Sequence, residues 1–162
     1  MAADIVRQVN GGDIDVVFST SSIPMALLNS PHPKVFYTDC TFIDLLEDYP
    51  ELANYPRQWR DEGHDLEHAA LHNCDMAIYT SEWAAHSAID HYGADPNKVK
   101  VVPFGSNFES HPSFDVVMDA VRSRSLQRCE LLLIGVHWER KGGPLAWEVA
   151  RDLNIAGIET RL

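Results

Sequence analysis

The chain has 162 residues, which fits one ordinary domain or parts of two. Its apolar fraction of 45% and charged fraction of 23% are typical of a soluble globular protein and not of a disordered one. A formal net charge of −11 argues against binding to a nucleic-acid backbone, which needs a basic face, and no apolar run approaches the roughly 18 residues that span a bilayer.

The first residues, Met1–Asp4, lack the basic and apolar regions of a secretory signal. The three cysteines, Cys40, Cys74 and Cys129, include no close pair such as C-x-x-C. Isolated cysteines next to apolar stretches are typical of buried or unreactive thiols in a reducing compartment. The sequence therefore predicts a cytoplasmic protein with no integral membrane segment and no nucleic-acid partner.

Five short apolar runs are the expected strands, and each breaks into a loop of small or polar residues. They are Ile14–Phe18, Lys34–Tyr37, Met76–Tyr79, Val99–Val102 and Leu131–Ile134. Because these runs are apolar on both faces, they favour strands that are covered on both sides, as in a parallel sheet. In an open parallel sheet, ligands bind beyond the carboxyl ends of the strands, so the loops after these runs are the expected site.

Helical patterns lie between the strands. Ser81 is a suitable N-cap and Gly93 a suitable stop for one of these helices. The alternation of strands and helices predicts βαβ crossovers and an open α/β sheet. The expected helices are Asp61–Asn73, with Leu66, Ala69 and Ala70 on its core side, Glu82–Tyr92, Phe114–Ser123, and a run from Pro144 to about Asn154 whose apolar stripe is Ala146, Val149, Ala150 and Leu153.

The domain organisation changes near residues 108–128. We expect residues 1–110 to form the later part of one Rossmann-like domain and residues 111–128 to form a connector with a helix. Residues 129–162 then supply the first βα unit of a second domain. One βα unit cannot bury a core of its own, so this second domain is expected to be incomplete in the chain.

The strongest chemical motif is the segment Gly135–Pro144, in which a buried strand ends in glycine and a loop carries Arg140 and Lys141 into Gly142 and Gly143. A helix N-terminus presents backbone N–H groups and partial positive charge, which suit a phosphate. An arginine can bind two phosphate oxygens, a lysine adds a point charge, and glycines allow close approach to the backbone. The segment matches neither a P-loop nor a dinucleotide-binding fingerprint, and an ordinary basic turn is the alternative.

A second motif is His64-Asp65-Leu66-Glu67-His68, which matches the H-x-x-E-H pattern of some metalloproteases. The spacing places both histidines on one helical face, as zinc requires. A third ligand is not evident, and a solvated helix face gives the same sequence. No metal site is predicted.

Other polar and aromatic residues admit two interpretations. Asp39, Thr41 and Glu82 could act in a cleft, but each equally suits a helix cap or the acid of a first helical turn. The four tryptophans favour packing over sugar binding, with Trp138 as the exception because it lies inside the basic loop.

Several segments, taken in order, resemble the family-4-type, or group 1, GT-B glycosyltransferases. They are Tyr79–Ala85, Tyr92–Val99, Val102–Asn107, Leu133–Gly135 and Glu139–Gly143. The resemblance runs from about residue 14 to the end of the chain. It implies two Rossmann-like domains facing a cleft, with the acceptor bound mainly by the first and a nucleotide sugar by the second. It also implies retention of anomeric configuration, no required metal ion and no cofactor beyond the nucleoside diphosphate sugar that serves as donor substrate.

The resemblance also assigns roles to particular positions. Lys141 and Arg140 would hold the donor diphosphate, with Gly142 and Gly143 beside them, and Gly135 would leave room for the nucleotide. Gly105 and Asn107 would lie close to the interdomain cleft, where the family often has an aspartate at the asparagine position. Asp39 occupies the strand-end loop where many members place a catalytic-site histidine. The expected catalytic residues are thus Asp39, Arg140 and Lys141.

The sequence departs from the family at several points. The glycine-rich loop that usually opens the first domain and the E-x7-E glutamates of the donor site are absent from residues 1–162. Val136 follows Gly135 where many relatives have arginine, and position 39 is not histidine. The chain is therefore expected to be part of a longer enzyme and to be inactive alone.

The predicted function of the whole enzyme is transfer of a sugar from a nucleoside diphosphate sugar to an unknown hydroxyl acceptor, with retention. Two alternatives remain open. One is a non-catalytic binding or interaction module derived from a GT-B protein, and the other is a metallohydrolase that uses His64 and His68.

Overall fold

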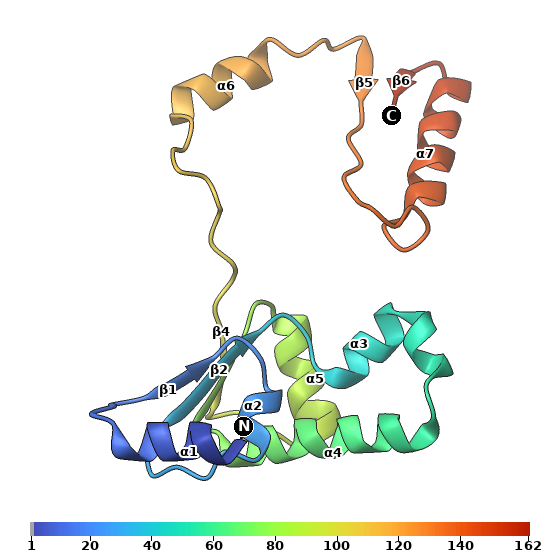
Figure 1. The fold of residues 1–162 in the computed structure, drawn as a ribbon. Coiled ribbons are helices and arrows are strands. Elements are labelled where there is room, and N and C mark those ends of the chain that lie inside the picture. The colour runs from blue at the N-terminus through green and yellow to red at the C-terminus, as the bar shows by residue number, and fades with distance from the viewer. Residues whose placement is uncertain (1) are drawn as a thin grey trace. The chain divides into compact units, whose positions relative to one another are not determined.

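The computed structural model describes residues 2–162, which form two compact units (Figure 1). The first unit extends to Gly105 and the second comprises Ser106–Leu162. Both have the α/β character expected from the sequence. In the described part of the chain, no helix combines the length and apolar character that crossing a membrane requires.

The first unit contains a four-stranded parallel sheet in the order β1-β2-β3-β4. Its strands are β1 Val17–Ser19, β2 Lys34–Thr38, β3 Met76–Tyr79 and β4 Val99–Val101. The first strand begins three residues later than predicted, and the other three agree with the prediction to within one residue. The parallel pairing, with Phe36 opposite Ala77, confirms the expected crossover topology and is compatible with a Rossmann-like fold.

Helices connect these strands. The sequence predicted α5, Glu82–Tyr92, with its bounds, and α4, Arg57–Asn73, from Asp61 onward. The true start of α4 follows Pro56, which takes the N-cap position. Four further elements were not predicted: α1 Ala2–Gly11, α2 Ile23–Ala26, α3 Phe42–Asp48 and the 3₁₀ turn Pro50–Asn54.

Both predicted ends of α5 are confirmed. Ser81 is the N-cap, and its Oγ accepts a hydrogen bond from the N–H of Ala84 at 3.3 Å. Gly93 ends the helix in the left-handed region, with φ of 64°. Such a conformation costs little for glycine and more for any residue with a Cβ.

Replacing Ser81 with alanine is expected to lower the free energy of unfolding of the first unit by about 1 kcal/mol, because the cap bond is lost. Urea denaturation measures this change. The same substitution at Ser110, which is exposed in the segment following the sheet, is the matched control and should have little effect. Equal effects of the two variants would contradict the capping role of Ser81.

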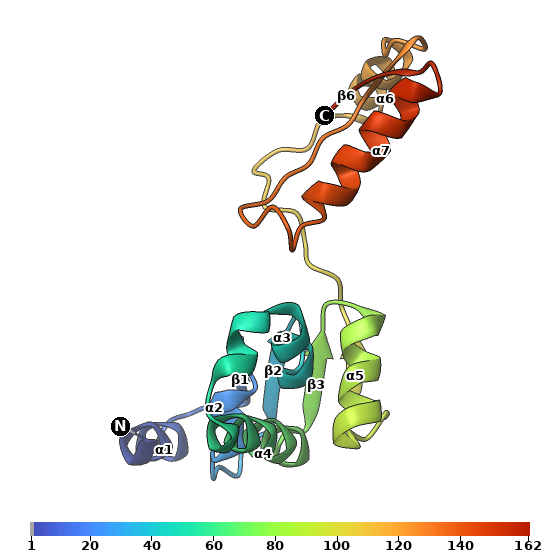
Figure 2. The same ribbon diagram turned by 90° about the vertical axis from the view of Figure 1, so that its right-hand side faces the viewer.

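The core of the first unit lies between one face of the sheet and the helices α4 and α5. Phe36 and Tyr79 are fully buried and meet edge to face, with ring centroids 6.0 Å apart. α5 lies alongside β3 (Figure 2). The helical contributions to the core include Ala70, Leu71, Ala84, Ala85 and Ala88.

The other face of the sheet is less covered than the sequence predicted. In β3, Ala77 and Tyr79 are buried whereas Met76 and Ile78 are half-buried, and Phe18 in β1 is 56% exposed. The expectation of strands covered on both faces is therefore wrong for the described sheet. Successive strands advance in one direction, and right-handed crossovers of that kind place their helices on the same face.

The second unit is a single βαβ arrangement preceded by a helix. It comprises α6 Phe114–Arg122, β5 Arg128–Glu130, α7 Gly143–Ile155 and β6 Glu159–Arg161, with β5 and β6 parallel. The side chain of Asn154 joins the last two elements, because its amide donates to the carbonyls of Ala150 and Thr160 and accepts from the N–H of Thr160.

The prediction of a strand at Leu131–Ile134 is wrong. Pairing occurs three residues earlier, and the N–H of Leu131 donates to the carbonyl of Arg161 at 2.8 Å as the last bond toward β6. Beyond that bond the apolar run is exposed at alternate positions, with Leu132 at 84% and Ile134 at 79%. The position of the partner strand, and not apolar character alone, sets the bounds of β5.

Much apolar surface of the second unit is exposed. Of the predicted stripe on α7, only Ala150 is buried, while Val149 is 43% exposed. The helix α6 buries none of its residues despite its marked apolar side. These helices therefore contribute little burial within the second unit.

Candidate functional site

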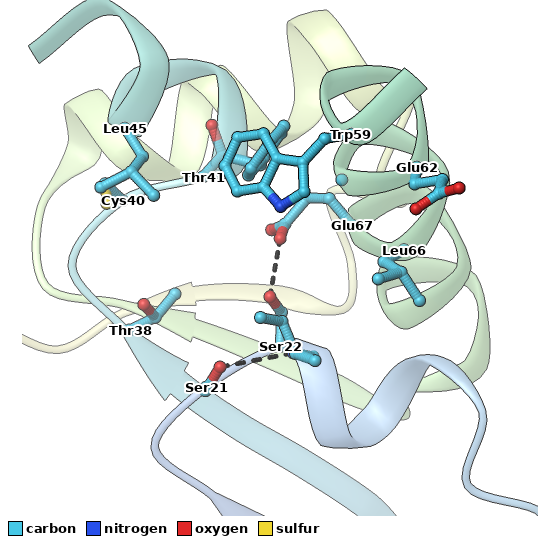
Figure 3. Close-up of a pocket in the computed structure, with 13 residues that line it drawn as sticks. Ser21, Ser22, Thr38, Cys40, Thr41, Leu45, Trp59, Glu62, Leu66 and Glu67 are labelled. Carbon is cyan, nitrogen blue, oxygen red and sulfur yellow. Dashed lines mark hydrogen bonds between the residues drawn. The ribbon is translucent and has the colours of Figure 1, made fainter. Parts of the chain in front are cut away.

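The first candidate site is a pocket of about 260 Å³ beyond the carboxyl ends of β1 and β2 (Figure 3). We call it the strand-end pocket. Ligands bind at such strand ends in open parallel sheets. The residues lining it come from the loop after β1 with the start of α2, from the end of β2 through the first turns of α3, and from α4: Ser21, Ser22, Ile23, Thr38, Cys40, Thr41, Phe42, Leu45, Trp59, Glu62, Gly63, Leu66 and Glu67.

Glu67 is the most unusual group in the strand-end pocket. Its side chain reaches across from α4, and the hydroxyl of Ser22 donates to its Oε2 at 2.6 Å. The residue is only 5% exposed, and its Oε1 has no hydrogen-bond partner among the described residues. Burial raises the pKa of this carboxyl, the bond from Ser22 lowers it, and the nearby charge of Asp44 raises it further.

Asp44 differs from Glu67 because its carboxylate is fully supplied with donors. Its Oδ2 accepts from the N–H and the hydroxyl of Thr41, both at 2.8 Å, and its Oδ1 accepts from the hydroxyl of Ser87 at 2.7 Å. Thr41 and Asp44 form a capping box at the start of α3. Of the two roles weighed for Thr41, the structure shows the helix cap, and Thr41 also lines the strand-end pocket. Glu82 likewise stands as the acid in the first turn of α5.

An aromatic wall forms one side of the strand-end pocket. The ring of Trp59 is stacked on Tyr55 with centroids 4.6 Å apart and tilted against Phe42 at 5.5 Å. Phe42 in turn lies against the Cα of Gly63, where a Cβ would overlap its ring. Trp59 remains 38% exposed, and its ring is open to the pocket (Figure 3). The wall is therefore preorganised by packing and still accessible.

The raised pKa of Glu67 predicts a pH-dependent stability. An acid whose folded-state pKa lies above its ordinary value, here 4.5, binds its proton more tightly when folded. Its stabilising contribution is then fully present below that ordinary value and is lost as pH rises through the folded pKa. Glu67→Gln keeps the shape of the side chain without ionising. The free energy of unfolding of this variant, relative to that of the unmodified protein, should therefore increase as the pH is raised from 4 to 8.

Urea denaturation at several pH values measures this gain. The matched control is Glu82→Gln on the exposed start of α5. A difference between Glu67→Gln and the unmodified protein that stays constant over this pH range would contradict the prediction.

Asp39 lies at the edge of the strand-end pocket. It is exposed and comes directly after β2, between Thr38 and Cys40, which both line the pocket. Burial, together with the charges of Asp39 and Asp44, raises the pKa of the Cys40 thiol to about 12. Cys40 is therefore protonated near neutral pH and is a poor nucleophile.

The second candidate site is the basic loop of the second unit, residues 135–143. Its backbone closes on itself: the N–H groups of Lys141, Gly142 and Gly143 donate to the carbonyls of His137, Glu139 and Trp138 at 2.9, 3.0 and 2.8 Å. Pro144 has no N–H. The start of α7 therefore offers an anion fewer backbone donors than the sequence suggested, and the side chains of Arg140 and Lys141 supply the positive charge.

Side chains pack closely against two glycines of the basic loop. A Cβ on Gly135 would lie 2.5 Å from Cγ of Lys141, and a Cβ on Gly143 would overlap the ring of Trp138. The space above Gly135, which we expected to be open for a nucleotide, is thus occupied by the stem of Lys141. Gly142 has φ of 77° and turns the loop into the helix. Each glycine position is therefore needed by the loop itself.

The remaining predicted site residues lie outside both candidate sites. Gly105 and Asn107 are exposed in the segment without regular structure where the first unit ends and the second begins. The structure thus gathers Gly135, Arg140, Lys141, Gly142 and Gly143 in one loop and places Asp39 beside the strand-end pocket.

The histidines of α4 do not converge as a zinc site needs. Nδ1 of His64 is 2.8 Å from the hydroxyl of Tyr92, whereas His68 stacks on His72 with ring centroids 4.5 Å apart. Glu67 points to Ser22 instead. Within residues 2–162, no group of three or more histidine, cysteine, aspartate or glutamate side chains is placed to hold a metal ion.

Glu67, Ser22 and Trp59 were not predicted as site residues. In the sequence, Glu67 is recognisable only as part of a metalloprotease pattern, and Trp59 is typical of a packing residue. Ser22 and Glu67 are 45 residues apart, so no local pattern connects them. The polar loop after β1 was the one available signal for Ser22. Comparison with protein-family models and with curated proteins finds no match to this chain.

Proposed function

We propose that the chain is part of a retaining, nucleotide-sugar-dependent glycosyltransferase of the GT-B type, a cytoplasmic enzyme of carbohydrate metabolism. The observation that carries the proposal is the packing of the basic loop. In an ordinary solvated basic turn, the aliphatic part of a lysine does not have to pack against a glycine. A tryptophan ring likewise does not have to pack against the first residue of a helix. That arrangement favours a fixed anion-binding loop, and the two cations make a diphosphate the best-fitting anion.

The reaction proposed for the enzyme is substitution at the anomeric carbon of the donor. The bond from this carbon to the diphosphate oxygen breaks, its electron pair stays with that oxygen, a bond to the acceptor oxygen forms, and the proton of the acceptor hydroxyl passes to solvent. The nucleoside diphosphate leaves with the additional negative charge. Arg140 and Lys141 stabilise that charge where it develops, which lowers the barrier most when the cations are already in place.

The first unit takes the acceptor in this proposal. The strand-end pocket lies where open parallel sheets bind ligands, and the aromatic face of Trp59 together with nearby hydroxyl and carboxyl groups suits a hydroxyl-bearing molecule. Asp39, exposed at its edge, is one acidic group that helps to orient the acceptor in this proposal. The proposed catalytic set is therefore Asp39, Arg140 and Lys141.

Turnover by the full-length protein tests the proposal. It is incubated with UDP-, GDP- and ADP-activated hexoses and a mixture of sugar acceptors, and nucleoside diphosphate release and the anomeric configuration of the product are measured. Release of one nucleotide with retained configuration is expected. A product of inverted configuration would overturn the retaining mechanism. Tight binding of a nucleotide sugar without turnover would favour the non-catalytic binding module.

A further inference from the structure

We propose that the strand-end pocket selects an uncharged, hydroxyl-rich ring of about monosaccharide size, with Glu67 as the hydrogen-bond acceptor and Trp59 as the platform. This inference rests on the proposed function, which assigns the acceptor to the first unit, and it names the chemical class of that acceptor. Four features of the pocket support it.

The first feature is the charge of the lining. Glu62 and Glu67 are the ionisable acids among the lining residues, and the lining includes no lysine, arginine or histidine. The carboxylate of Asp44 lies close enough to act on the pKa of Glu67. An anionic group in the pocket would meet these carboxyl groups without a cation to offset them, so phosphorylated sugars and sugar acids are disfavoured.

The second feature is the unpartnered Oε1 of Glu67. Ser22 holds the carboxyl through Oε2, so the other oxygen has a defined position. A buried acceptor without a donor is unfavourable, and Glu67 is one of the residues that line the pocket. A hydroxyl group of a bound ligand would supply the missing donor.

The third feature is the mixed character of the pocket lining. Trp59, Leu45 and Leu66 supply apolar groups, while Ser21, Thr38 and Glu67 supply polar groups. Figure 3 shows the Glu67 carboxyl close to the Trp59 ring. A sugar ring has the same mixed character, with C–H groups on one face and hydroxyl groups around its rim. The exposed flat ring of Trp59 matches the C–H face.

The fourth feature is size. The cavity of about 260 Å³ is smaller than the clefts that take drug-sized ligands, so it suits a single ring and not an extended chain. An ammonium group on that ring would have to give up its hydration in a pocket whose lining is largely apolar, a cost that a hydroxyl group avoids. A hydroxyl needs only an acceptor oxygen, which the carboxyl of Glu67 offers in either protonation state.

A set of matched probes tests the inference on the 162-residue chain without any donor. Glucose, galactose and mannose are each used as the methyl glycoside, as the 2-amino sugar and as the uronic acid. The measurement is the change in the ¹H–¹⁵N NMR spectrum, including the indole N–H of Trp59. At least one methyl glycoside should shift the Trp59 signal, and it should bind at least 10-fold more tightly than its amino and acidic forms.

Variants separate the proposed contacts from general damage. Glu67→Ala should weaken binding of the methyl glycoside at least 10-fold, whereas Glu67→Gln, which keeps an acceptor oxygen, should stay within about threefold. Trp59→Leu should abolish the binding, and Trp83→Leu, an exposed tryptophan outside the pocket, should not. Loss of binding in Glu67→Gln together with a preference for the amino sugars would overturn the neutral class.

The outcomes also separate this inference from the proposed function. Binding of methyl glycosides at Trp59 with no turnover by the full-length protein would retain the inference and reject the transferase. Turnover combined with preferred binding of an acidic or amino probe would retain the transferase and reject the inference. No shift of the Trp59 signal with any probe at 50 mM would overturn the inference.

Discussion

Replacing Lys141 with methionine is expected to lower kcat for glycosyl transfer by the full-length protein roughly 10²- to 10³-fold. Removing one preorganised group that stabilises developing negative charge has an effect of about this size. Methionine is chosen because its unbranched side chain can keep the contact that the lysine stem makes with Gly135. The substitution therefore removes the ammonium group while preserving the packing of the basic loop.

Steady-state kinetics at saturating donor measure this effect, and thermal unfolding shows that the fold is kept. Lys100→Met on β4 is the matched control, because Lys100 is exposed and belongs to neither candidate site. Its kcat should be unchanged. If Lys141→Met retained kcat within about twofold, Lys141 would have no part in stabilising the leaving diphosphate.

Replacing Gly143 with alanine is expected to lower the free energy of unfolding of the second unit by about 1–3 kcal/mol, the usual cost of overpacking. The added Cβ would occupy the position of the Trp138 ring, and Gly143 itself is buried. The ring must move, and the turn that carries Arg140 and Lys141 into α7 must move with it. Affinity for a nucleoside diphosphate should fall as well.

Thermal unfolding and the near-ultraviolet circular dichroism of tryptophan report on this variant. Gly105→Ala is the control, because a Cβ at Gly105 meets nothing within 4 Å and its φ is not in the left-handed region. An unchanged melting temperature together with an unchanged tryptophan signal in Gly143→Ala would show that Trp138 does not fix the loop.

The elements that the sequence predicted well are those specified by local chemistry. Helix α5 has a serine cap and a glycine stop next to a clear pattern, so its bounds follow from residues 81–93 alone. The four strands of the first unit are short apolar runs, and these predicted runs pair with one another in the sheet. Helix α3 also had a local signal, because Thr41 was recognised as a possible helix cap, but the helix that follows Thr41 was not predicted.

The elements that were missed depend on distant partners. The strand β5 is set by pairing with Glu159–Arg161, so the strongest apolar run, Leu131–Ile134, was the wrong choice. One-sided burial of the sheet follows from strand order, which apolar content does not reveal. In both cases the neighbouring element in the fold, and not the local apolar pattern, decides which residues pair and which are buried.

The two candidate sites show the same division. The basic loop is contiguous in sequence, and its residue types alone pointed to an anion. Its internal hydrogen bonds, which occupy three N–H groups, could not be inferred from those types. The strand-end pocket joins Ser22 to Glu67 and Trp59 through the fold, so only the structure brings the unpartnered oxygen of Glu67 and the aromatic wall together.

The most direct test of the proposed function is an NMR titration of the chain with UDP, GDP and ADP. At least one of them should shift the amide signals of Gly135, Gly142 and Gly143 with a dissociation constant below about 1 mM, and Lys141→Met should weaken this binding at least 10-fold. Unchanged signals for these three glycines at 10 mM of every nucleotide would contradict a donor site in the basic loop.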